Sequence, residues 1–141
     1  MKIENLYRQI IMEHYKNPLN KGLLSDADYL LIKMHNPSCG DDVTVQLKVE
    51  DNIIKDIRHD GVGCSICCSS ASVMSEVLKG LSKEEAIKIA ENFIDMVMNK
   101  EFNPNYLKGD MQAYSGVRTF PARVRCATLA WVAALKGLKE G

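Results

Sequence analysis

The chain has 141 residues, of which 46% are hydrophobic and 26% are charged, as is usual for one globular domain covering residues 1–141. Its 18 basic and 18 acidic residues give a formal net charge of zero and are scattered along the chain, which argues against a nucleic-acid partner. No apolar stretch approaches the roughly 20 residues of a membrane span, and no signal peptide is evident, so we expect a cytoplasmic protein without a membrane partner.

The first half of the chain predicts one helix and three strands. Residues 4–16 carry apolar side chains at helical spacing, and Asn17-Pro18 ends this helix because the residue before a proline avoids helical dihedral angles. Strands are predicted over residues 29–34, 43–49 and 53–59, and the second of them alternates apolar and polar residues most clearly. The short connections favour antiparallel pairing, since parallel neighbours need a long crossover.

The second half of the chain predicts helices. A helical pattern follows Gly61-Val62-Gly63, and Ser82 with Glu85 forms a capping-box pattern at the start of the next helix. Residues 103–116 are polar and are predicted to be a loop with a short helical turn. Pro121 suits the first turn of a last helix. The order of the predicted elements, one helix, three strands and then helices, predicts an α+β fold. Its helices pack on one face of a small three-stranded antiparallel sheet.

Five cysteines are the most informative residues of the chain. Thiols stay reduced in the cytosol, so an odd number of cysteines favours ligands or reactive thiols over disulfides. Cys39 lies in a loop before the second strand, Cys64 lies between the third strand and a helix, and Cys126 lies in the early turns of the last helix. All three are at the ends of predicted elements, which a compact fold can gather at one pole.

A carboxylate lies next to the first of these thiols. Gly40 has no side chain between Cys39 and Asp41, so both of these residues can project into the same small volume. Three thiolates and one carboxylate form a donor set that zinc accepts. The positive end of a helix favours the thiolate at Cys64 and, more weakly, at Cys126.

Other interpretations of these cysteines remain open. Each of the three is, taken alone, better explained as a buried small apolar side chain, as free cysteines often are. Cys64-Ser65-Ile66-Cys67 has the C-x-x-C spacing of a redox dithiol or of two ligands of one metal, and we favour the redox role less. Cys67 lies one helical turn from Cys64 and is a candidate spare thiol, while Cys68 is expected to pack in the interior.

Four segments resemble the SufU/IscU family of iron–sulfur cluster assembly proteins, which includes the N-terminal domain of NifU. The segments are Leu6-Tyr7-Arg8-Gln9-Ile10-Ile11-Met12-Glu13-His14-Tyr15-Lys16-Asn17-Pro18, Asn36-Pro37-Ser38-Cys39-Gly40-Asp41, Gly61-Val62-Gly63-Cys64-Ser65-Ile66 and Phe120-Pro121-Ala122-Arg123-Val124-Arg125-Cys126. Arg125 stands where IscU scaffolds carry a histidine, and residues 103–119 resemble the insertion of the SufU branch. Cys67 and Cys68 occupy positions that are usually not cysteine in either branch.

The resemblance implies a zinc-dependent sulfurtransferase that passes sulfur to downstream iron–sulfur assembly proteins. The implied ligands of Zn2+ are Cys39, Asp41, Cys64 and Cys126. Cys39 is implied to accept sulfur from the persulfide of a pyridoxal-phosphate cysteine desulfurase of the SufS or IscS type. Arg123 is expected to pair with a ligand such as Asp41 and steady the site, so Cys39 and Arg123 are the expected catalytic residues.

A scaffold is the alternative of a different class. In that case a transient [2Fe–2S] cluster is assembled on Cys39, Cys64 and Cys126 and transferred to other proteins, since the same ligands hold zinc or a cluster. Arg125 and the insertion favour the sulfurtransferase. A purely structural zinc site is the least favoured interpretation.

Overall fold

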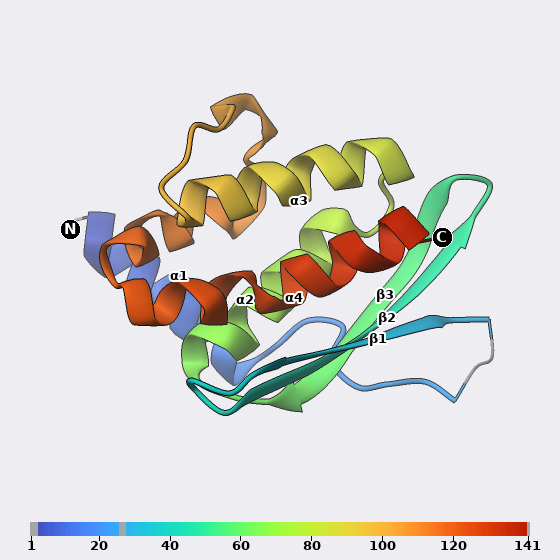
Figure 1. The fold of residues 1–141 in the computed structure, drawn as a ribbon, viewed down its shortest axis with the longest axis horizontal. Helices are drawn as coiled ribbons and strands as arrows, with labels where there is room; N and C mark the ends of the chain where they lie inside the picture. Colours follow the sequence, from blue (N-terminus) through green and yellow to red (C-terminus); the bar gives the residue numbers. More distant parts are fainter. Residues whose placement is uncertain (1–2, 26–27, 141) are drawn as a thin grey trace.

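The computed structural model describes residues 3–25 and 28–140, and its elements confirm the predicted α+β class (Figure 1). Within those residues, no helix combines the length and the apolar character that crossing a membrane requires. The elements are, in chain order, α1 (Ile3–Lys16), β1 (Leu30–Asn36), β2 (Asp41–Glu50), β3 (Ile53–Val62), α2 (Ser65–Leu78), α3 (Lys83–Val97), the 3-10 helices η1 (Pro104–Tyr106) and η2 (Gly109–Thr119), and α4 (Pro121–Glu140).

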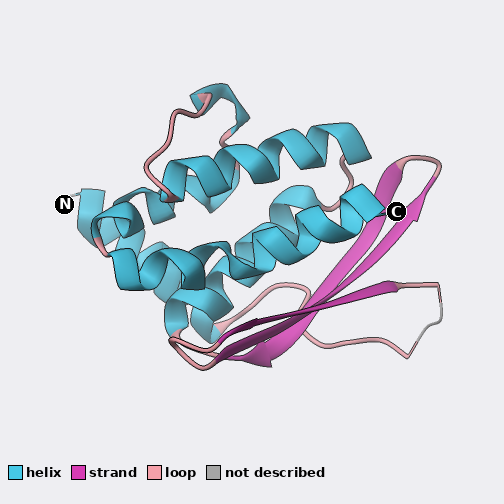
Figure 2. Ribbon diagram, in the orientation of Figure 1, coloured by secondary structure: helices cyan, strands magenta, loops and turns pink. Residues whose placement is uncertain are grey.

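The three strands form one antiparallel sheet in the order β1-β2-β3, and the helices cover one of its faces (Figure 2). Alternation in β2 places Val43, Val45 and Leu47 on the covered face, where each is at most 5% exposed. Helix α4 packs on β1 and β2, and α2 packs on β3. All three strands end later than predicted. Strand β2 also begins earlier, at Asp41 rather than at residue 43.

Helix α4 is the central element of the core, and it lies between α3 and the sheet (Figure 1). Its Trp131 stacks on Phe93 of α3 with the ring centroids 4.1 Å apart. The Trp131 Nε1–H donates to Ser70 Oγ of α2 at 2.9 Å, which satisfies the one polar group of the buried indole. Helices α2, α3 and α4 therefore meet at the Trp131 side chain.

Residues 103–116 contain the predicted short helical turn as η1, but the loop predicted for the rest is wrong, because most of it belongs to η2. Met111, Tyr114 and Val117 of η2 are buried and are spaced three residues apart. That spacing matches the 3.0 residues per turn of a 3-10 helix and brings the three side chains to one face. This three-residue spacing matches neither the α-helical period of 3.6 residues nor the strand period of two residues.

Tyr114 is expected to stabilise the packing of η2 against α2. Its hydroxyl is buried and donates to Ser69 Oγ at 2.8 Å. Tyr114→Phe should lower the free energy of unfolding by about 1 kcal/mol, because a buried hydrogen bond is lost while the ring remains. Urea unfolding measures the change. Tyr106→Phe, at a partly exposed tyrosine, is the control, and equal losses for both variants would contradict the assignment.

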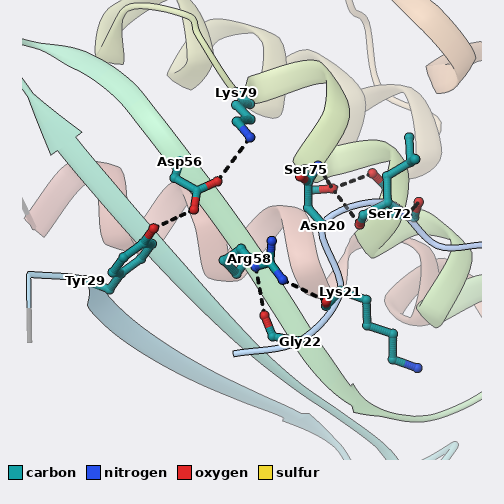
Figure 3. A network of polar contacts seen from close by, with 10 residues as sticks. Asn20, Lys21, Gly22, Tyr29, Asp56, Arg58, Ser72, Ser75 and Lys79 are labelled. Carbon is teal, nitrogen blue, oxygen red and sulfur yellow. Dashed lines mark hydrogen bonds and ion pairs between the residues drawn. The ribbon is translucent and has the colours of Figure 1, made fainter. Parts of the chain in front are cut away.

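The segment that follows α1 is tied to β3 and α2 by polar contacts (Figure 3). Arg58 of β3 donates to the carbonyl oxygens of Lys21 and Gly22 at 3.0 and 2.9 Å. Asn20 Nδ2 donates to Ser75 Oγ of α2 at 3.1 Å. These bonds satisfy backbone carbonyls in a segment that has no helix or strand, and they hold the end of α1 against α2.

Candidate metal centre

Cys39 and Asp41 lie at the tight turn that joins β1 to β2. Asn36 pairs with Asp41 as the last residue pair of the ladder, and the turn between them contains Cys39 and Gly40. Gly40 has φ of +67°, a left-handed conformation that glycine adopts without steric cost. Because β2 alternates, Asp41 lies on the same covered face as Val43 and is fully buried.

Helices α2 and α4 both begin at the end of the molecule that holds the β1–β2 turn (Figure 1). Cys64 and Cys126 lie at the starts of these two helices. Cys64 is the N-cap of α2, and its backbone N–H donates to Asp41 Oδ1 at 3.0 Å. Gly63 permits this approach, because a Cβ atom at that position would overlap the Asp41 carboxylate. Cys126 lies in the second turn of α4 and is fully buried.

Three of the four predicted ligands converge closely. Cys39 Sγ, a carboxylate oxygen of Asp41 and Cys126 Sγ all lie within 4.8 Å of one another. Cys64 falls outside this group of mutually close ligand atoms, although its side chain interacts with Cys126 and its N–H binds Asp41. The fold therefore gathers the predicted residues at one pole, with Cys64 at the edge of the group.

Asn36 is a buried residue of the centre that the sequence analysis missed. Its Nδ2 donates to Asp41 Oδ2 at 3.1 Å and to Cys126 Sγ at 3.6 Å, so one amide orients two of the proposed ligands. Its Oδ1 is buried without a hydrogen-bond partner among the described residues. The only signal in the sequence was its position at the start of the motif that contains Cys39.

Arg123 contacts proposed ligands, as expected, but its partners are the thiols of Cys39 and Cys126 rather than Asp41. Its Nη1 donates to Cys39 Sγ at 3.9 Å, and Cys39 Sγ donates to the carbonyl oxygen of Ala122 at 3.6 Å. Hydrogen bonding to Cys126, followed by the charges of Cys64 and Cys39, raises the pKa of the Arg123 guanidinium. The first turn of α4 thus brings the permanent positive charge of Arg123 to the exposed side of the centre.

Burial opposes ionisation of the Cys126 thiol. Burial, and then hydrogen bonding with the side chains of Asp41, Cys39 and Cys64, raises the pKa of Cys126. Burial, the largest cause of this shift, works against the thiolate that the start of the helix is expected to favour weakly at Cys126. A coordinated divalent cation reverses this balance, because a coordinating thiol loses its proton.

Cys67 and Cys68 do not form a reactive pair with Cys64. All five cysteines are free, and Cys67 is fully buried in the core, where burial raises its pKa. Cys68 is partly buried, its Sγ donates to the Gly63 carbonyl oxygen at 3.7 Å, and burial raises its pKa as well. Inert, protonated thiols argue against the redox-dithiol interpretation.

Asp41 and Asp42 offer a matched pair of variants for testing the metal assignment. Asp41→Ala should weaken metal affinity on the order of 100-fold, more than the loss of most outer-shell partners, because it removes a buried ligand. Asp42 points to the other face, pairs with His35 and has a side chain that is 61% exposed. Asp42→Ala should leave affinity unchanged in competition with a chromophoric chelator. Equal effects would rule out Asp41 as a ligand.

The fold and the centre together define a class: a small α+β protein with a cysteine-rich cation site at one pole of its sheet. Thiol sulfur suits zinc and iron–sulfur clusters, and the Asp41 carboxylate lies with the thiols of Cys39 and Cys126, while Cys64 at the edge of the group is the candidate fourth donor. The donor set fits such a cation. The buried carboxylate fits it as well, because a buried charge requires a partner.

Comparison with known proteins identifies the family. The family model described as "NifU-like N terminal domain" matches residues 6–138, so the chain belongs to the NifU-like N-terminal domain family, which confirms the predicted SufU/IscU relationship. It is 44% identical to the "Zinc-dependent sulfurtransferase SufU" of Bacillus subtilis, over 98% of this chain and 92% of that protein. It is 35% identical to the "Iron-sulfur cluster assembly scaffold protein IscU" of Streptococcus pyogenes, over 99% and 86%.

Solved structures agree with this relationship. The fold matches the crystal structure of a "Putative iron-sulfur cluster assembly scaffold protein for SUF system" from Fervidobacterium islandicum with a TM-score of 0.84 and 31% identity, over 97% of this chain and 99% of that one. It also matches the N-terminal part of a NifU-like protein from Brucella abortus with a TM-score of 0.83 and 26% identity, over 98% and 95%. The predicted sheet and its helical cover are therefore those of this family.

Proposed function

We propose that the protein is a zinc-dependent sulfurtransferase of iron–sulfur cluster assembly, in which Cys39 accepts persulfide sulfur. The observation that carries the proposal is the contrast between two neighbouring thiols. Cys39 is partly exposed at the β1–β2 turn, whereas Cys126 is fully buried. A partner protein can reach the first sulfur and not the second.

Zinc is the proposed resident cation, held by Cys39, Asp41, Cys64 and Cys126. When bound, it keeps the sulfur ligands deprotonated at neutral pH. Asn36 orients Asp41 and Cys126 from the buried side, and the N–H of Cys64 fixes the other carboxylate oxygen. Outer-shell bonds of this kind hold ligands in place.

Cys39 would take the sulfur by thiol–persulfide exchange. Its thiolate attacks the outer sulfur of the donor persulfide, and a new S–S bond forms at Cys39. The S–S bond of the donor breaks, and its electron pair leaves with the donor cysteine as a thiolate. No oxidant or reductant is consumed, and Cys39 now carries the persulfide.

Arg123 would assist at the exposed side of the centre. Its guanidinium lies 3.9 Å from Cys39 Sγ and carries its charge at any physiological pH. That charge favours the thiolate of Cys39 before transfer and the negative outer sulfur afterwards. Arg123 is therefore proposed to contact the reacting sulfur rather than to steady Asp41.

The proposed donor is a pyridoxal-phosphate cysteine desulfurase of the SufS or IscS type, and the proposed recipients are downstream assembly proteins in the cytoplasm. The Bacillus relative, which is named a zinc-dependent sulfurtransferase, supports this assignment over nearly the full chain. In this proposal the pyridoxal chemistry belongs to the donor, and the chain supplies the receiving thiol.

The experiment incubates the full chain with a cysteine desulfurase and cysteine. Faster sulfide release than with the desulfurase alone is expected, together with a mass increase of one sulfur atom on the peptide that contains Cys39. No stimulation and no adduct would refute the proposal.

A scaffold role is the second candidate, and the Streptococcus relative named as a scaffold favours it. In that role a [2Fe–2S] cluster, as cargo, is bound by the same thiols. A stable cluster on the reconstituted protein without any desulfurase stimulation would establish this role in place of sulfur transfer.

A further inference from the structure

A second group of ligand-type side chains lies apart from the cysteine centre. His14 near the end of α1, Glu76 of α2 and Asp110 of η2 place an imidazole nitrogen and two carboxylate oxygens within 4.8 Å of one another. Glu76 is 12 residues beyond Cys64, which corresponds to about 18 Å along the α2 axis. The two groups are therefore independent in space.

The histidine of this group is buried and held in a fixed orientation. His14 is only 7% exposed, and its Nδ1 lies 2.8 Å from Ser72 Oγ of α2. Ser72 is itself fixed, since its Oγ accepts the backbone N–H of Leu19 at 2.8 Å. Figure 3 shows Ser72 on α2 beside the segment that follows α1. A ring nitrogen bonded to a fixed oxygen is the arrangement that orients metal-binding histidines.

The other ring nitrogen faces the carboxylates. Nε2 of His14 lies 2.7 Å from Asp110 Oδ2, and the Asp110 side chain is 39% exposed, so it can shift to admit an ion. Glu76 is exposed and makes no hydrogen bond or ion pair with another described residue. Two carboxylates beside one imidazole give an excess of negative charge, which a divalent cation would neutralise.

We propose that His14, Glu76 and Asp110 bind a divalent first-row transition-metal ion at a site separate from the cysteine centre. One imidazole and two carboxylates suit zinc and its neighbours in that row rather than the soft cations that require thiolates. The ion joins α1, α2 and η2, which are otherwise connected at this point by hydrogen bonds of the single His14 ring. It anchors the start of η2 to the helical layer.

The test dialyses the full chain, as purified, against Co2+ and measures total bound zinc and cobalt. Glu76→Gln should bind about one metal ion per chain fewer than the wild type, because it converts a carboxylate ligand into a neutral amide. Asp110→Asn should show the same loss. Glu101→Gln, at another exposed carboxylate, should bind as much metal as the wild type.

The visible spectrum assigns the lost ion to its site. Cobalt bound to thiolates gives a strong sulfur-to-metal charge-transfer band in the near ultraviolet, which oxygen and nitrogen ligands do not. Glu76→Gln should therefore lose cobalt without losing intensity in that band, whatever the occupancy of the cysteine centre. Metal content equal to that of the wild type in both Glu76→Gln and Asp110→Asn, or a loss confined to the charge-transfer band, would overturn the proposal.

Discussion

Removal of zinc by a strong chelator is expected to lower the melting temperature by on the order of 10 °C or more, because structural zinc sites contribute roughly 10–16 kcal/mol of apparent binding energy. The proposed ligands join the β1–β2 turn, the start of α2 and the second turn of α4. Without the cation, Asp41 would remain as a buried carboxylate held by hydrogen bonds with Asn36, the Cys64 N–H and the Cys126 side chain. Thermal unfolding followed by circular dichroism, with and without chelator, measures the shift.

Two cysteine variants sharpen this experiment. Cys126→Ala removes a buried ligand, so its melting temperature should be low already and should change little on adding chelator. Cys68→Ala alters a partly buried thiol outside the proposed ligand set and should keep the full chelator-dependent shift. A wild-type melting curve that does not respond to the chelator would show that no cation stabilises this centre.

Local patterns were sufficient to predict most of the fold. Alternation in residues 43–49, the proline at position 18 and the capping residue Ser82 each act within a few residues, and the structure has the corresponding strand, helix end and N-cap. Glu85 shows the limit of such patterns. Its backbone N–H binds Ser82 as predicted, but its carboxylate pairs with Lys108, 23 residues away, at 2.9 Å. Tertiary contacts can redirect a side chain that a local motif assigns.

The sequence predicted those residues of the candidate centre that lie next to a glycine. Gly40 and Gly63 stand beside Cys39, Asp41 and Cys64. Gly40 takes the positive φ of the turn between Cys39 and Asp41, and Gly63 leaves room for the Asp41 carboxylate beside Cys64. No glycine or other local pattern marks Asn36 as part of the centre. Its role depends on the contact with Cys126, which lies 90 residues away in the sequence.

His14 shows the same limit in the second group of ligands. Its partners Ser72 and Asp110 are 58 and 96 residues distant in the sequence, so no spacing pattern connects them. Only the packing of α1 against α2 and η2 brings the three residues together.

Cys39→Ser is expected to abolish stimulation of the desulfurase, so that sulfide release falls to the rate of the desulfurase alone. Sulfur exchange requires a thiolate nucleophile on a sulfur that the donor can reach. A serine hydroxyl stays protonated at neutral pH and cannot form the persulfide. Of the three thiols proposed as ligands, Cys126 is fully buried, and Cys64, partly exposed like Cys39, lies outside the close group of Cys39, Asp41 and Cys126. Cys39 is the thiol to which Arg123 donates, so we expect that Cys64 does not replace it.

Cys68→Ser is the matched control, since it makes the same chemical change at a partly buried thiol whose pKa is raised by burial. It should retain most of the stimulation and the sulfur adduct on the Cys39 peptide. Cys67→Ser should also retain most of the stimulation, although it places a hydroxyl in the core and is a weaker control for that reason. Full stimulation by Cys39→Ser, with its folding checked by circular dichroism, would exclude Cys39 as the acceptor. An adduct that appears on another cysteine in that variant would identify the residue that takes the sulfur instead.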